Sequence, residues 1–171
     1  DLKARFGDAR RTQIINQTIG KFSERDLVPN EEVIVTLTNG GYIKRQPVAV
    51  YRSQHRGGKG IIGMTTKEED QIEIIQSTQN HDDIFFFTNR GRVFRQKVYE
   101  IPQSSRIAKG TAIVNVIQLA PEEVVTTLLT MPTYKPGDNL VMITRRGVIK
   151  KTEAEKYANI RANGLIAIKL V

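Results

Sequence analysis

The segment Thr38-Asn39-Gly40-Gly41-Tyr42-Ile43-Lys44-Arg45 decides the fold, because the chain repeats it twice more. The further copies are Thr88-Asn89-Arg90-Gly91-Arg92-Val93-Phe94-Arg95 and Thr144-Arg145-Arg146-Gly147-Val148-Ile149-Lys150-Lys151. In each copy a turn precedes a short basic strand, and the copies recur at a period of about 50 residues. A second glycine follows each copy at a nearly constant distance: Gly60, Gly110 and Gly164. Two markers that keep their register in three copies establish an internal repeat.

Each repeat is predicted to consist of β-strands. The β-branched run from Val33 to Thr38 ends at Asn39-Gly40, which is a strong hairpin signal. Glycine at the last turn position supplies a positive φ that a residue with a side chain would resist. Further turns are expected at Asn80 to Asp83 and at Lys135 to Asp138, each between apolar stretches. The second and third repeats are therefore predicted to be four-stranded meanders.

A period of about 50 residues with about four strands is typical of propeller blades. We therefore predict an all-β, propeller-like module of about three blades, which would span about residues 31–70, 71–120 and 121–171. The core-facing positions of the repeated strand are predicted to be Ile43, Val93 and Ile149. Phe85 to Phe87 is predicted to be a core strand.

Residues 1–30 differ from the repeats. Leu2, Phe6 and Ala9 recur at helical spacing, which predicts a helix from Asp1 to about Ile19. A polar connector is expected between this helix and the first strand.

The composition favours a polyanionic partner. The 171 residues include 26 Lys and Arg against 18 Asp and Glu, a formal net charge of +8, and each cation placed beside a phosphate releases condensed counterions.

The chain has no Cys, which excludes disulfides and thiolate metal sites. Apolar runs such as Ile84 to Phe87 are too short to span a bilayer. The start has neither the apolar core of a signal peptide nor an initiator Met, so we expect a fragment of a longer protein.

A glycine-rich basic segment, Gln54-His55-Arg56-Gly57-Gly58-Lys59-Gly60, follows the first copy. It resembles the box Gln-Arg-Arg-Gly-Gly-Lys-Gly of DNA gyrase A subunits and matches it everywhere except at the second position. The stretches Val35 to Thr38, Gly41 to Arg45 and Phe6 to Thr12 also resemble that family. The resemblance covers essentially the whole chain and places its opening at the end of the helical region that precedes the C-terminal domain.

This resemblance implies a β-pinwheel, a propeller-like disc whose neighbouring blades exchange strands. In the family, duplex DNA bends around the basic rim, and the box is needed for the wrap that permits ATP-dependent negative supercoiling. The resemblance implies no catalytic residue, metal site or cofactor here, because strand cutting, ATP and Mg²⁺ belong to other parts of an enzyme of two A and two B subunits. It also implies a bacterial cytoplasmic location. His55 and the small number of repeats depart from the family pattern.

The resemblance and the repeats together nominate residues for binding DNA. Wrapping requires phosphate contacts that do not read bases, and the box glycines would expose amide donors while Arg56 and Lys59 supply charge. Lys44 and Lys150 are the strand cations expected at the rim, because they alternate with the core-facing positions. The other candidates are the following cations: Arg45, Arg52, Arg92, Arg95, Arg106, Lys109, Lys151 and Arg161.

Two alternatives remain at this point. The topoisomerase IV counterpart of the gyrase family is a close one, although its members generally lack an intact box. A propeller that binds proteins, with its charge serving solubility, is the alternative from another class. The two histidines, His55 and His81, have no spaced partner, so a metal site is not predicted.

Overall fold

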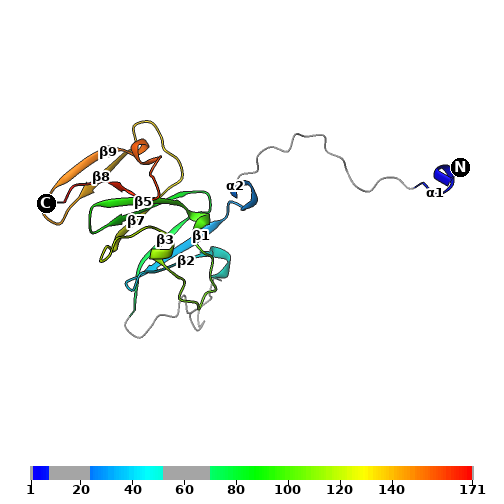
Figure 1. The fold of residues 1–171 in the computed structure, drawn as a ribbon, viewed down its shortest axis with the longest axis horizontal. Helices are drawn as coiled ribbons and strands as arrows, with labels where there is room; N and C mark the ends of the chain where they lie inside the picture. The colour runs from blue at the N-terminus through cyan, green and yellow to red at the C-terminus, as the bar shows by residue number, and fades with distance from the viewer. Residues whose placement is uncertain (1, 8–23, 52–69, 171) are drawn as a thin grey trace, which may run out of the picture.

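The computed structural model describes residues 2–7, 24–51 and 70–170. Strands dominate these residues and the helices are short (Figure 1). The helical elements are α1 (Leu2–Phe6), α2 (Glu24–Leu27) and four 3-10 turns, η1 (Val48–Val50), η2 (Val98–Glu100), η3 (Ile113–Asn115) and η4 (Ala154–Tyr157). The prediction of an all-β module is confirmed. α1 lies within the predicted N-terminal helix, most of which is outside the described residues, and α2 lies within the predicted connector.

The hairpin of the first repeat forms the centre of the first sheet. β1 (Glu32–Thr38) and β2 (Tyr42–Pro47) are antiparallel, and Gly41 closes the turn at φ 76° with its amide 2.9 Å from the Thr38 carbonyl oxygen. β3 (Ile72–Gln79) pairs with β1, and β6 (Thr111–Ala112) pairs with β2, which gives the order β3-β1-β2-β6.

The second sheet repeats this arrangement around the next hairpin. β4 (Asp83–Thr88) and β5 (Arg92–Lys97) lie at its centre, with β7 (Val125–Met131) beside β4 and β10 (Leu165–Ile166) beside β5. The order is β10-β5-β4-β7. The third hairpin, β8 (Asn139–Ile143) and β9 (Ile149–Glu153), forms a two-stranded sheet within the described part of the chain.

Strand exchange joins consecutive repeats. The second repeat gives its first and last strands, β3 and β6, to the first sheet, and the third repeat gives β7 and β10 to the second sheet. The prediction of four-stranded meanders is therefore wrong, because each repeat keeps only its central hairpin. The sheets consequently do not follow the predicted blade boundaries near residues 70 and 120. The exchange expected from the resemblance is confirmed.

The core lies between the first two sheets. Val35, Ile43, Phe86 and Val98 belong to one buried cluster that spans both repeats. Phe85 and Val93 belong to a second cluster, on the side of the third repeat. These positions confirm Phe85 to Phe87 as a core strand and Ile43 and Val93 as core-facing.

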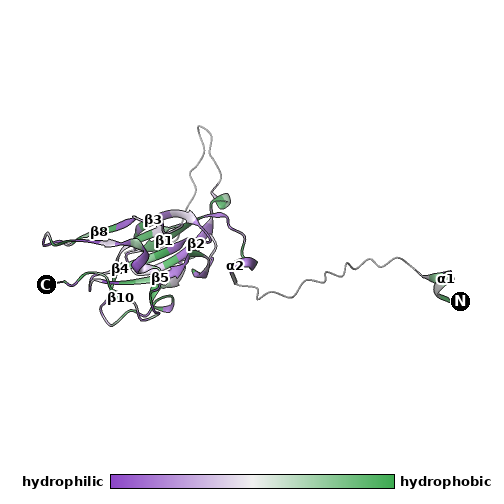
Figure 2. Ribbon diagram, turned by 90° about the horizontal axis from the view of Figure 1, so that it is seen from above, coloured by the Kyte–Doolittle hydropathy of each residue, from purple (hydrophilic) through white to green (hydrophobic). Residues whose placement is uncertain are grey.

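The third hairpin leaves its apolar side chains exposed. Ile149 is 65% exposed, so the prediction that it faces a core is wrong for the described structure. The physical reason is that β8 and β9 have no flanking strands here, whereas β1–β2 and β4–β5 each have two. Figure 2 shows the apolar residues distributed along these strands. No helix in the described ranges is long and apolar enough to cross a membrane.

Candidate nucleic-acid interface

Two loops carry the chain from one repeat to the outer edge of the preceding sheet. We call residues 102–110, which lead into β6, the first exchange loop, and residues 158–164, which lead into β10, the second exchange loop. β3 and β7 each form one edge of their sheet, and these two edge strands contact each other. β6 and β10 form the opposite edges of the two sheets. The exchange loops therefore lie on the outside of the array.

The repeated second glycine lets each exchange loop lie close to the preceding strand. Gly110 has φ 92°, and a Cβ there would lie 2.5 Å from the carbonyl oxygen of Ile43. Gly164 has φ 76°, and a Cβ there would lie 2.9 Å from the Phe94 ring. Both the backbone conformation and the close approach require glycine. The box ends on Gly60, the matching glycine of the first repeat, but the box and Arg52 lie outside the described residues.

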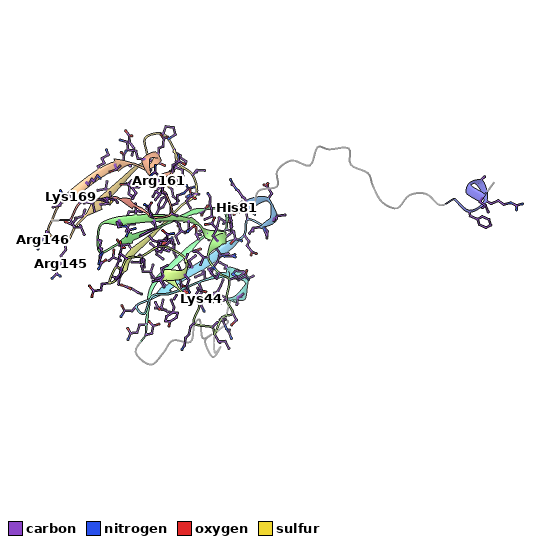
Figure 3. All side chains as sticks on the ribbon, viewed as in Figure 1. Lys44, His81, Arg145, Arg146, Arg161 and Lys169 are labelled. Atoms are coloured by element: carbon purple, nitrogen blue, oxygen red, sulfur yellow. The ribbon has the colours of Figure 1, made fainter. Side chains whose placement is uncertain are left out.

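Three of the predicted DNA-binding cations lie on the exchange loops. Lys109 and Arg161 are exposed and Arg106 is half-buried; Figure 3 labels Arg161. Among the described residues, none of the three forms an ion pair with a carboxylate. These cations are available to an anionic ligand at the outer edge.

Lys44 is not a rim residue. Its side chain is fully buried, and its ammonium donates to the carbonyl oxygens of Ser105 (3.4 Å), Arg106 (2.7 Å) and Ala108 (3.1 Å). Burial lowers the pKa of Lys44. The strand alternation is as predicted, but the first exchange loop covers the face to which Lys44 points. The prediction that Lys44 contacts DNA is therefore wrong.

Arg45 and Arg95 hold the following repeat. Arg45 is buried and donates from Nε to the carbonyl oxygen of Ile101 (3.2 Å) and from a terminal nitrogen to Asn80 Oδ1 (2.7 Å). Arg95 donates to the carbonyl oxygen of Ala158. Ile101 and Ala158 occupy matching places, each directly after a 3-10 turn. Arg45 is buried, so the prediction that it binds DNA is wrong. The bond from Arg95 to Ala158 is a contact between the second and third repeats.

Arg92 is engaged in a similar way. It forms an ion pair with the buried carboxylate of Glu123 at 2.7 Å and donates to the carbonyl oxygen of Asn163 in the second exchange loop. Its guanidinium carbon also lies 4.6 Å from the centre of the Phe94 ring. Burial opposes ionisation of Glu123, but bonds from the Ala120 amide and Thr88 together with the charge of Arg92 lower its pKa below the ordinary value.

A buried acid supports the contact made by Arg95. Asp83 lies 2.7 Å from Lys97 Nζ and 3.1 Å from Arg95, and Tyr134 donates its hydroxyl to the second carboxylate oxygen at 2.7 Å. Burial opposes ionisation of Asp83, but Lys97, Tyr134 and Arg95 together lower its pKa. Burial and the Asp83 carboxylate raise the pKa of Tyr134. This network joins the second and third repeats.

The third repeat presents the remaining strand candidates at its surface. Lys151 is exposed on β9, and Lys150 is exposed but donates to the carbonyl oxygen of Ala167 at 2.5 Å. The counterpart of Lys44 is therefore accessible in this repeat only, because the described chain has no further exchange loop to cover β9. Whether Lys150 and Lys151 meet DNA stays a prediction.

One basic cluster was not predicted from the sequence. Arg145 and Arg146 in the β8–β9 turn and Lys169 near the C-terminus gather at the same end of the array (Figure 3). They line one end of a cleft of about 990 Å³ between the second sheet and the third hairpin, together with apolar residues such as Leu140 and Met142. The position of both arginines in the repeated turn was the signal that could have identified them. Within the described ranges, no group of three or more acidic or histidine side chains could hold a metal ion.

Strand-exchanging sheets with cationic exchange loops at their outer edge define a propeller-like β-pinwheel. The family model described as "DNA gyrase C-terminal domain, beta-propeller" matches residues 32–78, 82–130 and 138–170. These matches cover most of the chain, which belongs to this family.

Curated relatives belong to the same family of proteins. The chain is 46% identical over 170 residues to the DNA gyrase A protein of Clostridium acetobutylicum, covering 99% of this chain and 20% of that protein. It is 43% identical over 169 residues to the DNA gyrase A protein of Staphylococcus aureus (strain COL), covering 98% of this chain and 19% of that protein. The chain thus spans about a fifth of the length of these relatives.

Solved structures are similar over most of the chain. A DNA gyrase A C-terminal domain matches with a TM-score of 0.66 and 28% identity, covering 81% of this chain and 44% of that one. The C-terminal domain of a DNA topoisomerase IV matches with a TM-score of 0.68 and 28% identity, covering 84% of this chain and 43% of that one.

Proposed function

We propose that this chain binds duplex DNA without reading its sequence and bends it around the outer edge of the pinwheel, as part of a DNA gyrase. The observation that carries the proposal is the placement of Arg106, Lys109 and Arg161 on successive exchange loops at that edge. Phosphates are the same in every sequence, so cations presented along a curved edge bind duplexes regardless of their bases.

The place of the box in the repeat adds support. The box ends on Gly60, as the exchange loops end on Gly110 and Gly164. By its position in the sequence repeat the box corresponds to the exchange loops of the later repeats, and we propose that Arg56 and Lys59 belong to the same series of phosphate-binding cations. We propose that the chain does not itself cut DNA, and that it acts in a complex of two A and two B subunits that uses ATP to introduce negative supercoils in the bacterial cytoplasm.

Binding is tested with fluorescently labelled duplexes of unrelated sequence over a series of salt concentrations. We expect similar affinities for all duplexes, and the logarithm of the association constant should fall with the logarithm of salt concentration by about 0.9 per neutralised phosphate. Replacing Arg106, Lys109 and Arg161 with Ala should weaken binding and reduce this slope. A matched control replaces Lys135 with Ala, another exposed cation that lies outside both exchange loops. A duplex association constant that does not depend on salt concentration would instead favour a protein-binding propeller.

Bending is tested by closing a nicked plasmid with ligase in the presence of the chain. A change in linking number that grows with protein concentration is expected if the chain wraps DNA, and an unchanged linking number would restrict its role to binding. The topoisomerase IV alternative is supported by a structural similarity close to that of the gyrase domain. Supercoiling by the complete enzyme distinguishes the two alternatives.

A further inference from the structure

We infer that the first exchange loop is a phosphodiester-binding site built largely from backbone amides, with Lys44 as the residue that positions it. The inference rests on the proposed function and deepens it. The sequence nominated Arg106 and Lys109 in this loop as charges, whereas the structure adds three peptide groups whose carbonyl oxygens converge on one buried ammonium.

Lys44 fixes the orientation of three peptide groups. Its ammonium donates to the carbonyl oxygens of Ser105, Arg106 and Ala108 from inside the array. The described chain has no cis peptide bonds. In a planar trans peptide the N–H points opposite to the carbonyl of the preceding residue. The amides of Arg106, Ile107 and Lys109 therefore point away from Lys44, towards the outside of the loop.

These three amides are unused within the described structure. The Ala108 amide closes the turn on the Ser105 carbonyl oxygen at 3.2 Å, but no hydrogen bond from the amides of Arg106, Ile107 or Lys109 to a described residue is present. Main-chain N–H groups carry partial positive charge, so each outward amide can donate to a phosphate oxygen. The side chains of Arg106 and Lys109 add positive charge beside these amides.

The arrangement also removes negative charge from the outer surface. Carbonyl oxygens that faced outward would repel a phosphate, and Lys44 draws three of them inward. The loop is further held by Gln46, whose side-chain amide donates to the Ser104 carbonyl oxygen at 3.4 Å, and by the close approach of Gly110 to Ile43. The amides are therefore oriented before a ligand arrives, which reduces the entropic cost of binding.

The second exchange loop lacks this device. Phe94 occupies the position of Lys44 and packs against Gly164, and Arg92 contacts a single carbonyl of that loop, the one of Asn163. We therefore expect the second loop to contribute charge through Arg161 without the set of oriented amides.

The test compares Arg106→Pro with Arg106→Ala in this chain. Both substitutions remove the guanidinium, but only proline also removes the amide donor, and residue 106 follows the first residue of the 105–108 turn, where proline is tolerated. We expect Arg106→Pro to bind a labelled duplex several-fold more weakly than Arg106→Ala. Equal affinity of the two variants would overturn the role of this amide.

A second arm uses Lys44→Met, which keeps the buried stem and removes the ammonium. We expect faster hydrogen exchange of the Ala108 amide and weaker duplex binding. The weakening should persist when Arg106 and Lys109 are already replaced with Ala, because those substitutions keep the main-chain amides that Lys44 orients. Val35→Ala, a core truncation on β1, is the control for general destabilisation and should not change the affinity at equal fraction folded. An unchanged hydrogen-exchange rate of the Ala108 amide, or an equal loss of duplex affinity in Val35→Ala, would overturn the inference.

Amide signals of the wild-type chain separate the inference from the proposed function. Titration with a short duplex should shift the signals of Arg106, Ile107 and Lys109. Salt-dependent duplex binding without these shifts would overturn the inference and leave the proposed function standing. Absence of salt-dependent duplex binding would overturn both.

Discussion

Arg45 Nε lies 3.2 Å from the carbonyl oxygen of Ile101, a residue 56 positions further along the chain. The bond joins the first repeat to the end of a 3-10 turn in the second, and Arg95 makes the equivalent bond to Ala158 in the third. The first and second repeats thus each hold the next repeat with an arginine at the same position of the repeated strand. The recurrence of basic residues in the sequence has a structural cause in addition to any role in binding.

Arg45→Met is expected to destabilise the fold. It leaves the Ile101 carbonyl and the Asn80 side chain without their donor in a buried place, and each loss costs about 1–3 kcal/mol. The free energy of unfolding, measured with urea, should fall accordingly. Lys156→Met, which breaks an exposed pair with Glu153, is the matched control and should change it by less than about 1 kcal/mol. Equal effects would contradict the structural role of Arg45.

The sequence predicted the repeat, the turns and the hairpins, because these depend on neighbouring residues. It predicted correctly that Ile43 and Lys44 point to different surroundings, since Ile43 packs in the core cluster and Lys44 contacts the first exchange loop. It could not predict what covers the Lys44 face, because that cover comes from residues 105–108 of the next repeat. Phe94, the apolar counterpart of Lys44, was the available sign that this position is buried.

Ile149 failed as a core residue for the same non-local reason. A strand buries its inner face only when neighbouring strands complete the sheet, and β8–β9 has none in the described structure. Of the candidate site, Arg106, Lys109 and Arg161 lie where an anion could reach them, while Lys44 and Arg45 do not. The burial of Lys44 and Arg45 depends on tertiary contacts, which cannot be predicted from charge and spacing in the sequence alone.

Stability at acid pH should depend on Asp83. Its pKa is lowered in the folded state, so its contribution is fully present above the ordinary aspartate pKa of about 3.9 and is lost as the pH falls through the lower folded value. Asp83→Asn should reduce stability at neutral pH, because Lys97 and Arg95 lose their partner, and should flatten the acid limb of the stability curve. Urea unfolding at a series of pH values measures both effects. An acid limb as steep as that of the wild type would exclude Asp83 as a major contributor.

Gly110 and Gly137 form a matched pair for testing the close approach of the exchange loop. Both have φ 92°, but a Cβ at Gly110 would meet the Ile43 carbonyl at 2.5 Å, whereas a Cβ at Gly137 meets nothing within 4 Å. Gly137→Ala should cost about 1 kcal/mol for backbone strain alone. Gly110→Ala should cost clearly more and should also weaken duplex binding, because the loop must move outward. Thermal unfolding and duplex titration measure the two effects, and equal costs at both glycines would show that the loop is not tightly packed.

The box provides the prediction about activity. Arg56→Ala with Lys59→Ala, introduced into a complete DNA gyrase that carries this segment, should abolish negative supercoiling while relaxation without ATP persists. The reason is that relaxation requires strand passage alone, whereas supercoiling also requires the DNA to be wrapped in one sense. Plasmid topology on agarose gels measures both activities, and unfolding of the isolated chain should be unchanged because the two cations are proposed to meet phosphate. His55→Arg is the converse variant and should strengthen duplex binding, since it adds a permanent charge beside Arg56. Supercoiling that survives the double substitution would remove the box from the DNA path and leave only the exchange loops that carry Arg106, Lys109 and Arg161.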